Sequence, residues 1–212
     1  EIAPVILDLN HNGEIDLLGV DSPVSVYADG QIYQMGWVGP GDGILMYDLY
    51  QDGIFRTMDQ IQFTSHHDDA KTDLEGLRLA FDSNFDNVFN QQDEMYDKFG
   101  VWQDVNTNGI LDMGEYQSLL NLGISEINLV SDQNSWVEDG NIIHGTTSFS
   151  YTAGGSGLVG DVSLALLSIS NTDVLGDQQS LSNYHSLDGY APSNTNQLDS
   201  GNLNTGSDSS LI

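Results

Sequence analysis

The chain has 212 residues, with 32 acidic and 4 basic side chains, and therefore a formal net charge of −28. This charge argues against nucleic acid as a partner and against direct contact with an anionic membrane, because both require a basic surface. Hydrophobic residues make up 39% of the chain, which is enough for a folded core, and the absence of cysteine excludes a disulfide framework.

The first half of the chain predicts strands that lead into polar loops. Residues 2–9 and 44–47 are short apolar strands, and the alternation over residues 24–38 predicts a hairpin that turns at Asp29-Gly30. A helix is predicted over residues 73–81, because Thr72 and Glu75 form a capping box in front of apolar residues at helical spacing.

The second half predicts two further helices and a set of strands. The helices are expected at residues 93–98 and 113–121, the second ending at Gly123. Strands are expected at residues 124–130, which we expect to pair with the first strand, in a hairpin over 136–152, and at 158–169. The predicted fold class is α+β, with short strands and helices organised around several EF-hand-like calcium loops.

The composition predicts one domain over residues 1–170 and a polar, low-complexity linker or tail over residues 171–212. Ordering of the tail against the domain through its few aromatic residues is the alternative. The first residue is Glu1 and not Met, which favours a piece of a longer chain.

The segment from Asp104 to Glu115 is a complete calcium-binding pattern. Oxygen-bearing side chains occupy loop positions 1, 3, 5, 9 and 12, and Gly109 allows the sharp turn at position 6. A hard cation needs about six oxygens in a small space, which alternate side chains on a curled backbone provide. The predicted ligands are Asp104, Asn106, Asn108, Ile110 through its carbonyl, Asp112 and Glu115.

Three further segments also begin with an aspartate but are less complete. In residues 82–93, Asn87 replaces the glycine at position 6, and Asn tolerates the left-handed backbone that this position needs. The predicted ligands are Asp82, Asn84, Asp86, Val88 through its carbonyl, Asn90 and Asp93 in this segment, and Asp8, Asn10, Asn12, Glu14 and Asp16 in the segment from residue 8.

The segment from residue 8 has Gly19 at position 12, so a further ligand must come from elsewhere, with Asp21, Asp29 and Asp42 as candidates. The segment over residues 48–59 is the weakest, because Tyr50 and Arg56 occupy two ligand positions. It binds calcium poorly, borrows ligands, or is held by packing alone. Its predicted ligands are Asp48, Asp52, Ile54 and Asp59.

Four or more Ca²⁺ ions are therefore predicted as the cofactor. Four ions would lower the net charge to about −20 and neutralise it where it is densest, so folding is expected to depend on calcium. Next to the weak loop, His66, His67, Asp68 and Asp69 either contribute to ligand binding with Tyr50 or form a solvated acidic loop. We see no nucleophile and base in a catalytic pattern, and predict no catalytic residue and no enzyme.

Several of these segments occur in a familiar order, namely Pro4–Asn10, Gly36–Gly43, Thr72–Leu77, Phe99–Asp104 and Gly114–Leu119. Over residues 2–165 the chain resembles the calcium-binding modules of very large RTX adhesins, which Gram-negative bacteria export by type I secretion. Within that group it looks most like their peptide-binding domain.

The resemblance implies calcium-dependent folding, an extracellular location at the bacterial surface, and neighbouring domains of a longer adhesin. It also implies a groove that captures C-terminal peptides of proteins on other cells, in adhesion and biofilm formation. A structural spacer without a ligand is the alternative. Related RTX proteins contain self-processing modules that cleave an Asp-Pro bond at their start, where this chain has Ala3-Pro4.

Overall fold

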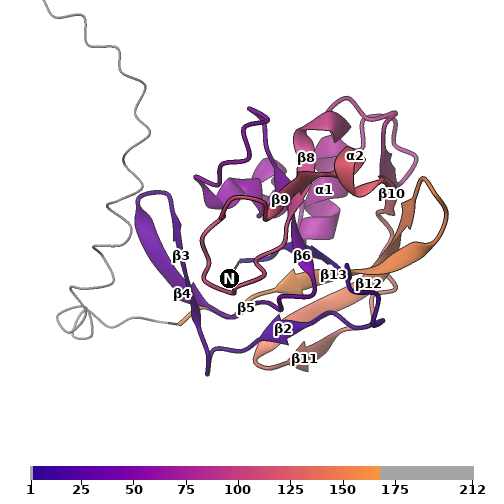
Figure 1. Cartoon of the computed structure of the whole chain (residues 1–212). Helices are drawn as coiled ribbons and strands as arrows, with labels where there is room; N and C mark the ends of the chain where they lie inside the picture. The colour runs from indigo at the N-terminus through magenta and orange to yellow at the C-terminus, as the bar shows by residue number, and fades with distance from the viewer. Residues whose placement is uncertain (1, 168–212) are drawn as a thin grey trace, which may run out of the picture. The chain divides into compact units, whose positions relative to one another are not determined.

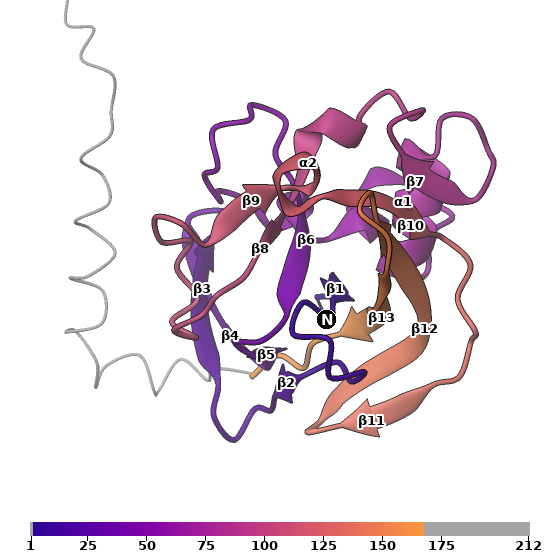
Figure 2. The same ribbon diagram turned by 45° about the vertical axis from the view of Figure 1, so that its right-hand side comes forward.

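The computed structural model describes residues 2–167, which form a mostly β domain (Figure 1). Its main sheet is antiparallel, has nine strands and curls into half of a barrel (Figure 2). The strand order is β7-β10-β12-β13-β1-β6-β8-β9, and β11 also pairs with β12. The strands are β1 (Val5–Leu7), β6 (Gly43–Tyr47), β7 (Val88–Asn90), β8 (Phe99–Trp102), β9 (Tyr116–Ser118), β10 (Ile124–Asn128), β11 (Trp136–Glu138), β12 (Asn141–Tyr151) and β13 (Ser156–Ser163).

Two small sheets and a few helical segments cover the main sheet. The small sheets pair β2 (Leu17–Leu18) with β5 (Trp37–Val38), and β3 (Val24–Ala28) with β4 (Gln31–Met35). The helical segments are α1 (Asp73–Phe81), α2 (Leu119–Leu122) and the 3-10 turns η1 (Met58–Gln60), η2 (Phe63–His66) and η3 (Tyr96–Lys98). Within residues 2–167, no helix is long and apolar enough to cross a membrane.

The central strands are buried on both faces, because each face packs against a different core. In β1, Val5 and Leu7 join the core beneath α1, and Ile6 points into the opposite core with Trp37 and the β3–β4 hairpin. Strands covered on both sides read as continuous apolar runs, which explains the uninterrupted Val5-Ile6-Leu7 sequence. The core thus fixes where each of these strands ends and where its polar loop begins.

The predicted α+β class is wrong. Within the described residues only two α-helices occur, of nine and four residues, and the fold is organised by sheets. An EF-hand places a helix on each side of its loop. Here β1, β6 and β8 lead into three of the aspartate loops, and only the loop at 82–93 follows a helix. The buried apolar runs before the loops favoured strands over helices.

Several predicted elements are confirmed. The hairpin at residues 24–38 turns at Asp29 and Gly30, which have φ of 53° and 76°. The hairpin over 136–152 is present as β11 and β12, with Asp139 and Gly140 at its turn. The predicted helix at 73–81 is α1, and the Glu75 backbone amide donates to the side chain of its N-cap Thr72.

Other predictions are wrong. Residues 93–98 form only the turn η3, and residues 113–121 contain β9 before the short α2, although Gly123 does end α2 in a left-handed conformation. Strand β10 pairs with β7 and β12 and not with β1. The long β12 pairs with β13 over eight residue pairs, and β13 lies beside β1 in the place expected for β10. The predicted tail at 171–212 lies outside the described residues.

Candidate functional site

The four aspartate loops share one backbone arrangement around a buried first carboxylate. In each loop the aspartate at position 1 accepts a hydrogen bond from the backbone amide at position 6. The donor–acceptor pairs are Gly13–Asp8 (3.0 Å), Gly53–Asp48 (2.8 Å), Asn87–Asp82 (2.9 Å) and Gly109–Asp104 (2.8 Å). All four aspartates are at most 3% exposed. The loops are therefore one structural motif used four times.

The backbone at position 4 of each loop is also left-handed, with φ of 59° at His11, 54° at Gln51, 60° at Phe85 and 55° at Thr107. Position 6 is left-handed as well, and Asn87 adopts φ of 65° there, as its residue type predicted. Two left-handed residues so close together curl the chain around its own first side chain. This curl directs alternate side chains toward one point.

Side chains at positions 3, 5 and 9 meet in the first and last loops. The Asn106 and Asn108 amide groups both donate to Asp112 Oδ2 at 3.0 Å. In the first loop, the amide groups of Asn10 and Asn12 donate to Asp16 Oδ2 at 2.8 and 3.1 Å. A side-chain amide carries an oxygen beside its nitrogen, so rotation would present oxygens to a cation at the same point.

The residue at position 12 connects both sides of its loop. Glu115 accepts hydrogen bonds from the backbone amides of Val105 and Asp112, at positions 2 and 9, both at 3.1 Å. Asp93 accepts from the corresponding amides of Ser83 and Asn90 at 2.8 and 2.9 Å. The shorter Asp93 side chain thus takes the same structural position as Glu115.

Asp42 takes this position in the first loop, where Gly19 stands at position 12. Its carboxylate accepts a hydrogen bond from the Asp16 amide at position 9, at 2.8 Å. Of the other two candidates, Asp29 accepts instead from the Met58 amide at 3.0 Å, and Asp21 is exposed. The sequence predicts Asp42 as one of three candidates for the missing ligand, and this hydrogen bond identifies it among them.

The first loop contains buried carboxylate oxygens that no protein group pairs with. Oδ1 of Asp8 and Oδ1 of Asp42 are both buried and have no hydrogen-bond partner. Burial, with the charges of Asp16 and Asp8 nearby, raises the pKa of Asp42 to about 7. Buried carboxylate oxygens are normally paired, so this oxygen-only donor set fits a hard cation such as calcium.

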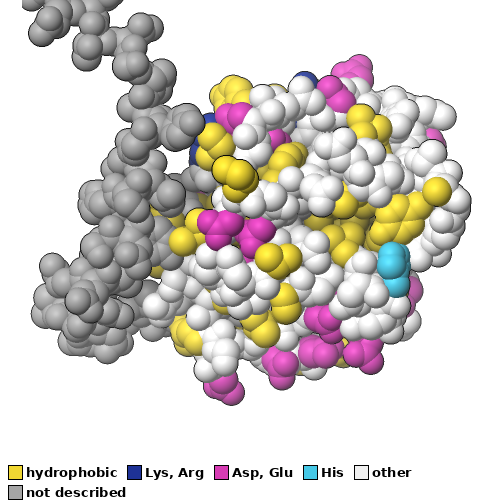
Figure 3. Space-filling model, viewed as in Figure 1, with side chains coloured by type: hydrophobic (Ala, Val, Ile, Leu, Met, Phe, Trp, Pro, Cys, Tyr) yellow, Lys and Arg dark blue, Asp and Glu magenta, His cyan; other side chains and the backbone are white. Residues whose placement is uncertain are grey.

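Within residues 2–167, no three His, Asp or Glu side chains converge closely enough to hold a metal ion by themselves. The loops also contain amide and carbonyl oxygens, which together with carboxylates are the donor mixture of calcium loops. Acidic side chains are also spread across the face shown in Figure 3, where basic side chains appear only near its upper edge. Bound cations would reduce this charge density.

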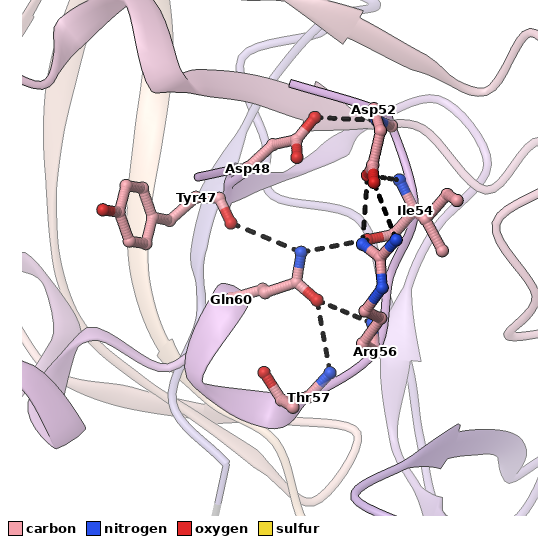
Figure 4. A network of polar contacts seen from close by, with 8 residues as sticks. Tyr47, Asp48, Asp52, Ile54, Arg56, Thr57 and Gln60 are labelled. Carbon is pink, nitrogen blue, oxygen red and sulfur yellow. Dashed lines mark hydrogen bonds and ion pairs between the residues drawn. The ribbon is translucent and has the colours of Figure 1, made fainter. Parts of the chain in front are cut away.

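The loop at 48–59 differs from the others in its side chains. The Arg56 guanidinium forms an ion pair with Asp52 at 2.7 Å and also donates to the Ile54 carbonyl at 3.2 Å (Figure 4). Gln60 accepts from the Arg56 amide at 2.6 Å, at the place that carboxylates take in the other loops. The predicted ligand Asp59 is exposed and does not take this place.

A pocket of about 340 Å³ lies beside this loop, and we call it the aromatic pocket. Its lining residues are Tyr47, Leu49, Tyr50, Arg56, Thr57, Asp59, Gln60 and His66. Of the predicted ligand-binding residues, Tyr50 and His66 line it, and His67, Asp68 and Asp69 do not. The sequence missed Arg56 and Gln60 as lining residues of this pocket.

His66 is held by polar and aromatic contacts. Its Nε2 lies 2.9 Å from the Asp59 carbonyl oxygen, and its ring packs edge-on against Tyr47 and Phe81. Tyr50, in contrast, is 74% exposed. The pocket thus combines a packed wall at His66 with the exposed ring of Tyr50. Of the three tryptophans, Trp37 and Trp102 are fully buried core residues, and Trp136 is 41% exposed.

Fold and site together define an antiparallel, mostly β domain that carries four loops of one conformation. Residues 5–165 match the family described as the SPM domain, so the chain belongs to the SPM domain family. Iron-regulated protein FrpA of Neisseria meningitidis serogroup C is 32% identical over 141 residues, which are 61% of this chain and 12% of that protein. The chain thus spans a small part of this relative's length.

Proposed function

We propose that this domain is a calcium-dependent ligand-binding module of a bacterial surface RTX adhesin, located outside the cell beside further adhesin domains. The observation that carries the proposal is the pair of buried, unpartnered oxygens on Asp8 and Asp42 in the first loop. Burying such charge without a partner costs several kcal/mol, which a bound cation would offset. The loops at 82–93 and 104–115 share this conformation and also have a carboxylate, Asp93 or Glu115, in the place of Asp42, which extends the argument to them.

The loop residues would hold the ion through carboxylate, amide and carbonyl oxygens. Bound calcium would supply positive charge where the chain has little of its own. The chain's part is to place the donors, and the hydrogen bonds of Asp42, Asp93 and Glu115 to their loops hold these carboxylates in position. Folding and calcium binding would then be coupled.

The proposed ligands are exposed C-terminal peptides of proteins on other cells, and the proposed site is the aromatic pocket. Its volume of about 340 Å³ is at the small end of ligand sites, which suits a short peptide end. Tyr47 and Tyr50 offer aromatic surface to a side chain. A terminal carboxylate needs a cation or backbone amides in a chain as acidic as this one.

A structural spacer stiffened by calcium is the second candidate, since rigid loops alone would serve that role. A self-processing module has less support. Ala3 stands where such modules have the aspartate of an Asp-Pro bond, and the Pro4 carbonyl accepts a hydrogen bond from Val162 inside the sheet region. We therefore propose that the domain is not an enzyme.

Calorimetric titration of the calcium-loaded chain with short peptides tests the proposal. Free and amidated C-termini would be compared, and each titration repeated in EDTA. We expect saturable heat only with free acids and calcium, reduced about tenfold in affinity by Tyr50→Ala and unchanged by Tyr27→Ala, which lies outside the pocket. Equal binding of amidated peptides would contradict carboxylate recognition, and no heat from a calcium-stabilised domain would favour the spacer.

A further inference from the structure

The loop at 48–59 has the backbone of the other three loops but different side chains at the positions that face its centre. Asp48 accepts the Gly53 amide at 2.8 Å, and Gln51 has φ of 54°, as at the same positions elsewhere. The Asp52 side chain accepts the Ile54 amide at 3.1 Å, as position 5 does in the other loops. The 48–59 loop therefore differs from the other three in its side chains and not in its backbone.

Arg56, at position 9, places a cation against the oxygens that an ion would use. Its Nη1 and Nη2 donate to the two carboxylate oxygens of Asp52, at 3.0 and 2.7 Å, and Nη1 also donates to the Ile54 carbonyl at 3.2 Å (Figure 4). Positions 5 and 7 supply ligands in a calcium loop. In this loop both are bonded to a guanidinium. The corresponding position 9 holds Asp16, Asn90 and Asp112 in the other loops.

Gln60 takes the position that a closing carboxylate has in the other loops. Its Oε1 accepts the amides of Arg56 and Thr57 at 2.6 and 3.2 Å, and its Nε2 donates to the Ile54 carbonyl at 3.1 Å. The other loops use a carboxylate to receive the position 9 amide. A neutral amide adds no charge for an ion, and its N–H occupies the same carbonyl oxygen that an ion would need.

The residues at positions 3 and 1 of this loop also lie near the Arg56 guanidinium. Position 3 is Tyr50, whose ring lies 5.8 Å from the guanidinium carbon, within range of a cation–π contact. Oδ1 of Asp48 is buried without a hydrogen-bond partner, and this carboxylate interacts electrostatically with Arg56. The guanidinium thus meets one carboxylate directly and a second through space.

We infer that Arg56 and Gln60 take the place of calcium in the 48–59 loop, so that this loop is formed without a metal ion. The fixed cation of the aromatic pocket, which both residues line, is then the Arg56 guanidinium and not calcium. The inference concerns the metal content of one loop, and it holds or fails separately from peptide binding.

Calcium stoichiometry, measured by native mass spectrometry of the full chain, tests the inference. We expect Asp52→Ala, which removes the side-chain oxygens at position 5, to bind the same number of ions as the wild type. Asp104→Asn, changed in the complete loop, is expected to bind one fewer. The double variant R56D/Q60E restores an acidic position 9 and an acidic closing residue, and we expect it to bind one ion more.

Loss of one ion in Asp52→Ala or Asp48→Asn would overturn the inference, because it would place calcium in this loop. A folded R56D/Q60E chain that gains no ion would overturn the roles given to these two residues. If the double variant does not fold, the stoichiometry of Asp52→Ala still decides, since Asp52 lies at the surface with its side chain 36% exposed. The Asp104→Asn result bears on the proposed function and not on this loop.

Discussion

The Asp42 carboxylate accepts a hydrogen bond from the backbone amide of Asp16, 26 residues earlier in the chain, at 2.8 Å. Two segments must approach closely for this contact. The Gly39 amide donates to the Asp16 carbonyl at 2.6 Å, and a Cβ on Gly39 would come within 2.7 Å of the Asp16 Cβ. The glycines of the 39–43 segment thus allow a remote carboxylate to complete the first loop.

Asp42→Asn is expected to weaken calcium binding at the first loop. The change keeps the size of the side chain but removes the charge that this loop lacks at position 12. Hydrogen bonds and contacts of charged groups contribute about 1.5–3 kcal/mol, which predicts a loss of about 10- to 100-fold in affinity for one ion. Calcium titration followed by calorimetry would measure it.

Asp21→Asn is the matched control, because Asp21 is an exposed aspartate near the end of the same loop. It should leave every affinity within about twofold of the wild type. If Asp42→Asn and Asp21→Asn behave alike, Asp42 is not the completing residue.

Local signals were readable from the sequence, and long-range pairing was not. The turns at Asp29-Gly30 and Asp139-Gly140 depend on residues that tolerate positive φ, so their positions followed from residue type alone. The partner of β10 depends instead on which apolar face each strand presents to a core that forms only in three dimensions. The helix expected at 113–121 failed for the same reason, since β9 pairs there with β8 and sheet pairing overrides helical spacing.

Removal of calcium by EDTA is expected to destabilise the whole domain. Ligand binding to the folded state contributes about 2.7 kcal/mol per site at a hundredfold excess over Kd, so three sites would contribute on the order of 8 kcal/mol. That is comparable with the total stability of a typical domain, and the calcium-free chain should be largely unfolded. Circular dichroism during thermal unfolding, in calcium and in EDTA, measures the difference.

Magnesium at the same concentration serves as the control for ionic strength and charge screening. It prefers a rigid octahedral shell and gives up its water reluctantly, so it should restore little of the stability. Identical melting curves in calcium and EDTA would contradict the calcium loops as a source of stability.

Trp37 is expected to report calcium binding at the complete loop. Its Nε1 donates to Asp104 Oδ2 at 2.8 Å, and both residues are fully buried. An ion bound at this loop would interact with the Asp104 carboxylate. Because Trp37 is hydrogen-bonded to that carboxylate, the fluorescence emission of its indole would change. Trp37→Phe should abolish most of the calcium-dependent change in tryptophan fluorescence and cost about 2–4 kcal/mol through the lost bond and the cavity.

Trp136→Phe is the control for this experiment, because Trp136 is 41% exposed and bonds to Glu138. It should reduce total emission and leave the calcium-dependent change intact. A Trp37→Phe chain with an undiminished calcium response would show that the signal arises elsewhere.

In the candidate site, too, features set by adjacent residues could be predicted from the sequence, and contacts between distant segments could not. Positions within one loop were predicted from spacing, because the curl of the backbone depends on a few adjacent residues. The role of Gln60 was not visible, since the sequence places Asp59 at position 12 and only the turn η1 shows which of the two side chains faces the loop. The sequence predicts a ligand site that includes Tyr50 and His66, but the contact between Tyr47 and His66 forms only when β6 and η2 pack together.

Asp73 is expected to make stability depend on pH, independently of the calcium loops. It is fully buried at the start of α1, where Oδ1 accepts the Thr64 amide at 2.7 Å and Oδ2 has no partner. Burial, opposed by these backbone hydrogen bonds and increased by the nearby charge of Asp161, raises the pKa of Asp73 to about 7. The folded state therefore holds this proton more tightly than the unfolded chain, in which the pKa is ordinary.

The contribution of Asp73 to stability is consequently complete below about pH 4 and is lost as the pH rises through about 7. Asp73→Asn keeps an oxygen acceptor for Thr64 and cannot ionise. Its stability relative to the wild type should rise between these pH values, by on the order of 4 kcal/mol at most. Urea unfolding of both proteins at matched pH and saturating calcium measures the difference, because the effects of calcium are the same in both proteins and cancel.

Asp139→Asn, at an exposed turn with φ of 49°, should show no such trend. A constant difference between Asp73→Asn and the wild type across this range would mean that Asp73 ionises normally in the folded domain.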